Sequence, residues 1–358
     1  MTQKPILVSG IQPTGRLHIG NYLGALKNFV ELQNSGKYQC YFFIADLHAL
    51  TENPDAKELN KNIAGLASDF LAAGIDPKKS VIFQQSQISA HPELAWILNT
   101  ITPMGELFRM TQFKEKAAGG AKDISELDFS DKSISHKAKE MAVKFIHTRQ
   151  SEANAGLFDY PILMAADILL YGTKLVPVGD DQDQHLELTR TLARKFNSKF
   201  GDTFIEPKAL HTPVPRVMSL TDPNKKMSKS QPEGCLFMDD EPEDIKRKIA
   251  RATTDSGSEI KHERERKAGI SNLLEIYSSM TDEPINKIEK RFSGKGYGEF
   301  KKSLTETISD YFADFRKKKK SLAAKPSTLK SVLSAGSKKA STKASAKIAE
   351  VKKKVGLI

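Results

Sequence analysis

The chain of 358 residues contains little cysteine and no long hydrophobic run. Its two cysteines, Cys40 and Cys235, lie far apart without a CxxC partner, which excludes a disulfide framework and a cysteine-rich zinc site. We expect two reduced, partly buried thiols. No apolar stretch approaches the roughly 20 residues that span a bilayer, and the first residues lack the apolar core of a signal peptide. These absences predict a cytoplasmic protein that does not bind a membrane.

Acidic residues are nearly absent from the C-terminal tail, residues 316–358. The tail holds fourteen Lys or Arg residues and one acid, Glu350, so its own net charge is +13. The whole chain has a net charge of +11, so the remaining residues carry 11 − 13 = −2. Charge segregated in this way predicts a local contact with a polyanion. The Lys-, Ser- and Ala-rich tail either forms basic helices or stays disordered until a partner binds.

Short apolar runs alternate with helical patterns over the first two thirds of the chain. This alternation predicts an α/β fold, a Rossmann-like parallel sheet that binds ligands at the carboxyl ends of its strands. The expected strands are 6–8, 41–45, 81–83 and 175–178, and the expected helices are 56–73, 92–100 and 161–171, with a further helix after residue 20.

The strand signals stop near residue 239. Helical spacing follows at 245–250, 270–280 and 300–315. A single core rarely grows beyond about 250 to 300 residues, so the length favours two domains. We therefore expect a Rossmann-like catalytic domain over 1–238 and a C-terminal α-helical domain over 239–358 that carries the basic tail.

The segment GIQPTGRLHIGN at 10–21 follows the first predicted strand and leads into a helix. Its glycines let the backbone approach a ligand, and a helix N-terminus offers unpaired N–H groups to phosphate. His18 and Asn21 are three residues apart, which places them on one side of the first turn, and Gln12 precedes them. On the residues alone, an ordinary capped turn is an equally good interpretation.

A second segment, KKMSKS at 225–230, lies in a polar loop between Pro223 and Pro232. Its ammonium and hydroxyl groups suit a triphosphate, although an isolated lysine run is usually a solvated surface. In this order the two segments resemble the HIGH and KMSKS signatures of class I aminoacyl-tRNA synthetases, with Asn21 in place of the last His. The resemblance implies that the second loop closes over the pyrophosphate leaving group.

The resemblance assigns residues to the activation of an amino acid with ATP, which Mg²⁺ accompanies. Three residues stabilise the transition state: His18, Lys226 and Lys229. The implied ATP contacts are Gln12, Pro13, Thr14, Gly20, Asn21, Val217, Met227, Ser228 and Ser230, together with Lys226 and Lys229.

Asp167 lies in the middle of the apolar segment 160–171. An ionised carboxylate there requires a partner, which is either an N–H or Arg group of the fold or a donor on the substrate. Residues 160–185 resemble the specificity helix and following loop of tryptophanyl-tRNA synthetases. The resemblance implies that Asp167 accepts the indole N–H. It also implies that the amino acid is held by Tyr160, Met164 and Gln182, and that the adenosine lies near Gly179, Asp180 and Asp181.

Three further segments resemble bacterial or organellar tryptophanyl-tRNA synthetases: QPTG at 12–15, GNYLG at 20–24 and MTQFK at 110–114. The implied activity is ligation of tryptophan to tRNA(Trp) by a homodimer, with the helical domain and tail holding the RNA. Val8 and Gln12 disfavour a tyrosine-specific relative. The helical domain disfavours a small-molecule adenylyltransferase, and His18 with the motif lysines disfavours a catalytically silent RNA-binding protein.

Residues 117–153 form a stretch that is longer than the family pattern. We interpret it as a tolerated surface insertion, with Lys114 and Lys116 still in a phosphate-facing loop. The single tryptophan, Trp96, is expected in the core or at an interface. His48 matches a position beside the family's pocket, and we expect a structural role for it.

Overall fold

The computed structural model describes residues 4–110, 154–179, 182–211 and 216–358. Five parallel strands form one sheet in the order β3-β2-β1-β4-β5. The strands are β1 (Ile6–Ile11), β2 (Gln39–Ile44), β3 (Ser80–Gln84), β4 (Leu175–Val178) and β5 (Lys208–His211). The parallel sheet confirms the expected Rossmann-like fold. The sequence reading missed β5, because this edge strand has only four residues, two of them exposed, and lacks a buried apolar run.

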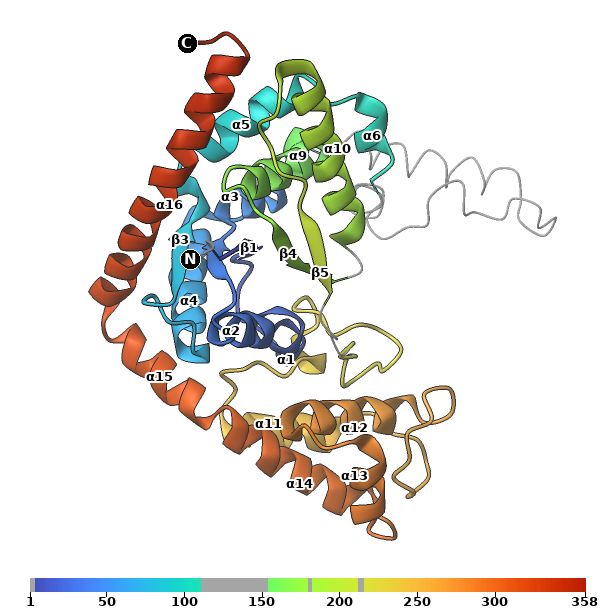
Figure 1. Ribbon diagram of the computed structural model, residues 1–358. Helices are drawn as coiled ribbons and strands as arrows, with labels where there is room; N and C mark the ends of the chain where they lie inside the picture. The colour runs from blue at the N-terminus through green and yellow to red at the C-terminus, as the bar shows by residue number, and fades with distance from the viewer. Residues whose placement is uncertain (1–3, 111–153, 180–181, 212–215) are drawn as a thin grey trace, which may run out of the picture.

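Helices cover both faces of the sheet, and β1 shows why (Figure 1). Successive side chains of a strand point to opposite faces, so Leu7 enters one hydrophobic cluster while Ile6 and Val8 enter the other. The first cluster includes residues of α2 (Lys27–Asn34) and α4 (Ala56–Ala73), and the second includes residues of α5 (Ala90–Asn99), α9 (Ala155–Leu169) and α10 (Asp183–Phe200).

The helix that carries Asp167 is longer than the sequence predicted. α9 begins at Ala155, not at 161, and the Oδ1 atom of its N-cap, Asn154, accepts a hydrogen bond from the Leu157 N–H at 2.8 Å. Pro161 therefore lies inside the helix. The expected start was wrong because proline favours the first turn of a helix, but here the cap seven residues earlier sets the boundary.

The first signature segment leads into one continuous helical stretch. α1 (Ile19–Asn21) passes through a π-helical turn, η1 (Tyr22–Leu26), into α2. Such turns occur frequently at functional sites. Shorter helical segments fill other connections: α3 (Asp46–Ala49), η2 (Leu50–Glu52), η3 (Gln85–Gln87), α6 (Met104–Phe108) and η6 (Pro232–Gly234).

Four helices form a separate unit below the sheet in Figure 1. They are α11 (Pro242–Arg251), α12 (Ala268–Thr281), α13 (Ile285–Arg291) and α14 (Gly296–Tyr311). This unit confirms the helical patterns expected after residue 239. Phe300, Leu304 and Ile308 on α14 are buried, as their spacing predicts.

The basic tail forms two helices, α15 (Ala313–Ala323) and α16 (Pro326–Lys354). α16 lies along the edge strand β3 rather than extending the helical unit (Figure 1). Gly336 permits the close approach, because a Cβ atom there would lie 1.8 Å from the carbonyl oxygen of Ile82. Ala340 and Ala344 are fully buried nearby. The tail thus covers an otherwise open sheet edge, and within 239–358 its last helix packs on the sheet domain.

The structure also places the two cysteines and gives the lengths of the helices. Cys40 and Cys235 are free and buried, as predicted. Across the described ranges, none of the helices has the length and apolar character needed to cross a membrane.

Candidate active site

A cavity of about 340 Å³ opens at the carboxyl ends of β1 and β4. The chain builds β2 and β3 on one side of β1 and then β4 and β5 on the other, so this cavity lies at the point where the strand order reverses. Open α/β sheets bind ligands at this position. All four residues expected to hold tryptophan line it, and so do Gln12 and Gly179. The four are Tyr160, Met164, Asp167 and Gln182.

The Asp167 carboxylate, only 1% exposed, lies at the centre of a hydrogen-bond network. Its Oδ1 atom is 2.6 Å from His91 Nδ1 and 2.8 Å from Gln85 Nε2. Its Oδ2 atom is 2.9 Å from both His48 Nε2 and Gln85 Nε2. His91 Nε2 in turn lies 2.8 Å from the Tyr171 hydroxyl. The expected internal partner is therefore an amide with two imidazoles, and the fold fixes the carboxylate before any ligand arrives.

The environment of Asp167 keeps its carboxylate ionised. Burial would raise its pKa, but the charge and hydrogen bonds of His91 and His48 outweigh burial and lower the pKa from its usual value. His91 donates its Nδ1–H to Asp167, and its Nε2 contacts the Tyr171 hydroxyl, so the ring is held at both nitrogens. An ionised acceptor on the cavity wall suits a ligand that carries an N–H donor.

His48 has a larger role at the cavity than the sequence predicted. It both lines the cavity and contacts Asp167. Sequence reasoning missed Gln85 and His91 entirely. The signal for Gln85 was its position. It follows the carboxyl end of β3, as His48 follows that of β2, and parallel strands place functional side chains there. The Tyr160 hydroxyl is fixed at 2.6 Å from His185 Nε2.

His18 is the N-cap of α1, and its ring is oriented by Asn21. The Asn21 N–H donates to His18 Nδ1 at 3.3 Å, while Asn21 Oδ1 accepts from the His18 N–H at 3.2 Å. Nδ1 is thus an acceptor, and Nε2 carries the ring proton. Burial, with smaller contributions from Lys229 and Lys226, lowers the pKa of His18 to about 4. His18 is therefore a neutral hydrogen-bond donor at neutral pH.

Gly20 is required by the position of the His18 ring. A Cβ atom at Gly20 would lie 3.0 Å from ring atoms of His18 and 3.5 Å from Cβ of Val217. Gly20 therefore lies close to both the His18 ring and Val217, which places the segment before the second signature beside the first. A larger residue at position 20 would displace the imidazole.

The second signature loop meets the first through Lys229. Its ammonium group lies 3.0 Å from Oγ1 and 3.4 Å from the carbonyl oxygen of Thr14. Burial lowers the pKa of Lys229. The loop is anchored by the buried Met227, whose N–H donates to the Val217 carbonyl oxygen at 3.1 Å. The two signature segments thus meet through Lys229 and Thr14.

The remaining predicted nucleotide contacts are placed less tightly. Lys226, Ser228 and Ser230 are exposed, and the two serine hydroxyls are 2.9 Å apart. Pro13 and Met227 are buried. Other predicted positions lie outside the described residues: Asp180, Asp181, Lys114, Lys116 and the insertion 117–153. Among the residues that are described, no group of three or more His, Cys, Asp or Glu side chains could hold a metal ion.

The sequence of the whole site matches a known family. The pattern of "tRNA synthetases class I (W and Y)" matches residues 1–313. The chain belongs to this family. Its similarity extends to a tryptophan–tRNA ligase of Caldanaerobacter subterraneus subsp. tengcongensis, which is 46% identical over 98% of both chains.

Solved synthetase structures share the fold over nearly the full length. A tryptophanyl-tRNA synthetase of Campylobacter jejuni, complexed with ADP and tryptophan, superposes with a TM-score of 0.79 at 36% identity and covers 98% of this chain and 99% of its own. The tryptophanyl-tRNA synthetase of Mycoplasma pneumoniae gives a TM-score of 0.81 at 33% identity, covering 99% of this chain and 98% of its own.

Proposed function

We propose that this synthetase is a tryptophan–tRNA ligase that forms tryptophanyl-adenylate and pyrophosphate from tryptophan and ATP and then esterifies tRNA(Trp). One observation carries the proposal. The cavity lined by Asp167, Tyr160, Met164 and Gln182 opens beside Gln12, whose loop is bridged to the second signature by Lys229. An amino-acid pocket and a triphosphate site are therefore adjacent.

The proposed activation step needs charge stabilisation more than proton transfer. The tryptophan carboxylate attacks the α-phosphorus of ATP, its oxygen forms the new P–O bond, and the bond to pyrophosphate breaks. The Nε2–H of neutral His18 donates to a phosphate oxygen. Lys229, already fixed against Thr14, and the exposed Lys226 balance the negative charge on the departing pyrophosphate.

Side-chain selection rests on Asp167. Its carboxylate accepts the indole N–H. Phenylalanine has no donor at this position, so its binding would leave the buried carboxylate without that hydrogen bond. The position of the carboxylate is set by His48, His91 and Gln85 before the substrate binds. Preorganisation of this kind lowers the cost of ordering the pocket on binding.

Amino-acid-dependent pyrophosphate exchange tests the proposal directly. Each of the twenty amino acids is supplied separately with ATP and labelled pyrophosphate, and we expect label in ATP only with tryptophan. The Lys229→Ala variant serves as the blank for contaminating synthetases. Exchange that follows tyrosine, or no exchange with any amino acid, would refute the assignment.

The proposed tRNA partner fits the exposed face of α16. Lys330, Lys338 and Lys339 are exposed there, while the opposite side of the helix packs on the sheet. Removal of the tail would uncover β3, so charge-neutralising substitutions are the better test. We expect the triple Lys→Gln variant to raise KM for tRNA and to flatten its salt dependence, with pyrophosphate exchange unchanged as the internal control. An unaltered KM and salt slope would exclude this face.

The proposed homodimer has a candidate contact surface on α5 and α6. Trp96 is 70% exposed, which excludes the core position considered for it and leaves the interface. Met104 and Phe108 on α6 are 59% and 54% exposed. Large exposed apolar side chains favour a protein contact. Light scattering of a Trp96→Lys variant should report a monomer; a dimer of unchanged stability would refute this interface.

Mg²⁺ and the cellular location also belong to the proposal. In it, Mg²⁺ arrives with ATP and is held chiefly by triphosphate oxygens, the arrangement it prefers in nucleotide sites. A tRNA substrate places the enzyme in the cytoplasm.

A further inference from the structure

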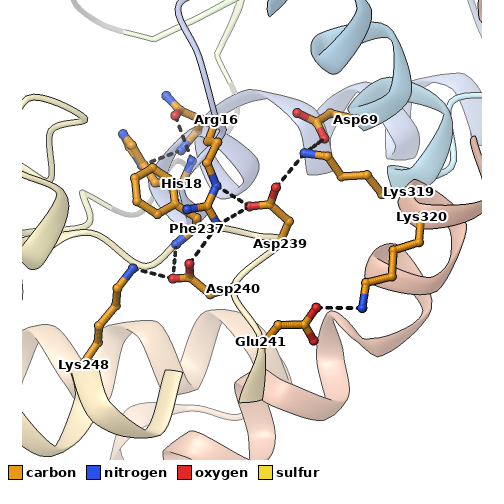
Figure 2. A network of polar contacts seen from close by, with 11 residues as sticks. Arg16, His18, Asp69, Phe237, Asp239, Asp240, Glu241, Lys248, Lys319 and Lys320 are labelled. Atoms are coloured by element: carbon orange, nitrogen blue, oxygen red, sulfur yellow. Dashed lines mark hydrogen bonds and ion pairs between the residues drawn. The ribbon is translucent and has the colours of Figure 1, made fainter. Parts of the chain in front are cut away.

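A chain of alternating charges connects the first signature loop to the C-terminal half of the molecule (Figure 2). It begins at Lys319 of α15, whose ammonium group lies 2.6 Å from Asp69 Oδ1 and 2.9 Å from Asp239 Oδ2. Asp69 belongs to α4, and Asp239 immediately precedes the helical unit. One side chain therefore joins three segments that are far apart in sequence.

The next links reach the signature loop itself. Asp239 Oδ1 accepts from Nε and Nη2 of Arg16 at 2.9 and 2.6 Å. Arg16 also reaches Asp240 Oδ1 at 2.9 Å, and the second Asp240 oxygen lies 2.6 Å from Lys248 of α11. Three acids and three bases thus alternate: Asp69, Lys319, Asp239, Arg16, Asp240 and Lys248.

Arg16 has little freedom within this chain of contacts. Its guanidinium group lies 4.2 Å from the centre of the Phe237 ring. Backbone hydrogen bonds run beside it, from the Ile19 N–H to the Leu236 carbonyl oxygen at 2.9 Å and from the Met238 N–H to the Leu17 carbonyl oxygen at 3.0 Å. A displacement of Asp239 would therefore move the backbone on both sides of His18.

The burial of the network makes Lys319 important to it. The Asp69 side chain is 3% exposed and that of Lys319 is 21% exposed. Burial raises the pKa of Asp69 to about 6, although Lys319 opposes the rise. The charge of Asp69 also acts on Lys229, where it favours the protonated form. Loss of Lys319 would therefore leave Asp69 without its ion pair and alter the field at a proposed catalytic lysine.

We propose that Lys319 is a positioning residue for amino-acid activation, because it holds Asp69 and Asp239 together and thereby fixes Arg16 and the His18 loop relative to Lys229. This inference rests on the proposed synthetase function. It gives α15 a part in ATP use that is separate from any contact with RNA. The tryptophan cavity is lined by none of the six charged residues, so its affinity should not depend on them.

The neighbouring lysine supplies a matched control. Lys320 lies on the same helix and pairs with Glu241 at 2.7 Å, but its side chain is 71% exposed. An exposed pair of this kind contributes little. Lys319→Met and Lys320→Met remove the same charge from adjacent positions and keep the length of the side chain.

The experiment measures pyrophosphate exchange with ATP and tryptophan varied separately. We expect Lys319→Met to lower kcat/KM for ATP by about tenfold or more, with KM for tryptophan within about twofold, since one broken charged contact corresponds to roughly this factor. Lys320→Met should match the parent for both substrates. Equal effects of the two variants, or equal losses for ATP and tryptophan, would overturn the inference.

Two further variants separate positioning from stability. Lys319→Arg should restore most of the ATP efficiency, because it keeps the charge. Asp69→Asn combined with Lys319→Met removes the unpaired buried carboxylate, so the melting temperature should recover while the ATP defect persists through Asp239. Recovery of both together would assign Lys319 a structural role only. The parent enzyme tests the proposed function separately. If the parent shows no tryptophan-dependent exchange, the proposed function is refuted, and this result does not depend on any variant.

Discussion

The proposed tryptophan cavity and the proposed nucleotide loops are built in opposite ways. Around Asp167, a buried carboxylate is held by four contacts from three side chains, and all of them are internal to the sheet domain. In the nucleotide region, Lys226, Ser228 and Ser230 are exposed, and Lys229 alone bridges the two signature segments by side-chain hydrogen bonds to Thr14. The polar groups of the first region are buried and bonded to one another, whereas several of those in the second are exposed.

The difference follows from what each region must do. Selection between similar side chains needs a polar group whose position does not adapt, because adaptation would accept the wrong substrate. Binding of a triphosphate and release of pyrophosphate need cationic groups that can engage and then withdraw. We therefore expect substitutions in the first region to change the kinetic constants for tryptophan, and substitutions in the second to change those for ATP.

The largest effect should come from Lys229. Lys229→Ala removes the ammonium group that bridges the signatures, and we expect kcat/KM for ATP in pyrophosphate exchange to fall by about 10²- to 10³-fold. Lys225→Ala is the matched control, since Lys225 lies in the same loop with a side chain 69% exposed and its ammonium group lies 3.1 Å from Asp222 Oδ2. Comparable losses in both variants would mean that loop charge alone matters.

Asp167→Asn tests the other side of the comparison. The amide keeps the shape but loses a charged acceptor, so KM for tryptophan should rise by about 10- to 100-fold with little change in KM for ATP. Asp46→Asn is the control, because Asp46 is also buried and accepts from Gln84 at 2.7 Å, yet it does not line the cavity. If Asp46→Asn raises the tryptophan KM equally, network rigidity explains the effect.

A substitution far from both regions gives a reference for stability. Gly336→Ala forces α16 away from β3, and we expect the free energy of unfolding to fall by about 1 to 3 kcal/mol with both KM values unchanged. The same change at Gly65 in α4, where a Cβ atom would meet nothing within 4 Å, should instead stabilise the fold by about 1 kcal/mol. Urea denaturation measures both; the same sign for the two would show that α16 is not seated as described.

Acid should affect the two regions in different pH ranges. The folded state keeps His18 neutral down to a pKa of about 4, whereas the unfolded chain protonates it near 6.5, so stability falls as pH drops through this range. We expect roughly 1 to 2 kcal/mol to be lost between pH 7 and 5 through His18. The pKa of Asp167 is lowered, so its contribution is lost only below its unfolded value of 3.8. Urea titrations of His18→Asn should lack the first loss; an unchanged slope between pH 7 and 5 would contradict the neutral imidazole.

The sequence correctly placed His18 and Asn21 together on one turn, because that relation is local. His18 and Asn21 lie three apart in a turn, and their mutual capping follows from that spacing. Strands β1 to β4 were visible as apolar runs because both of their faces are buried. β5 and the start of α9 were missed, since a short exposed edge strand and a cap before an internal proline leave weak patterns.

The hydrogen-bond partners of Asp167 and the surface on which α16 packs could be identified only from the folded structure. Gln85 and His91 lie about eighty residues from Asp167 in sequence, and only the alignment of β3 beside β2 brings them to its carboxylate. The small residues on α16, such as Gly336, likewise do not predict a packing partner until the backbone of β3 is seen to lie against them. Periodicity reports how a segment is buried, but it does not identify the surface that buries it.

By itself, the sequence determined the two signature segments, the alternation of strands and helices, and the charge of the tail, because each is a property of neighbouring residues. Tertiary structure alone decided that Lys229 meets Thr14, that Lys319 joins Asp69 to Asp239, and that the tail covers the sheet edge. These contacts bring together groups separated by tens to hundreds of residues, and chain topology sets which of them meet.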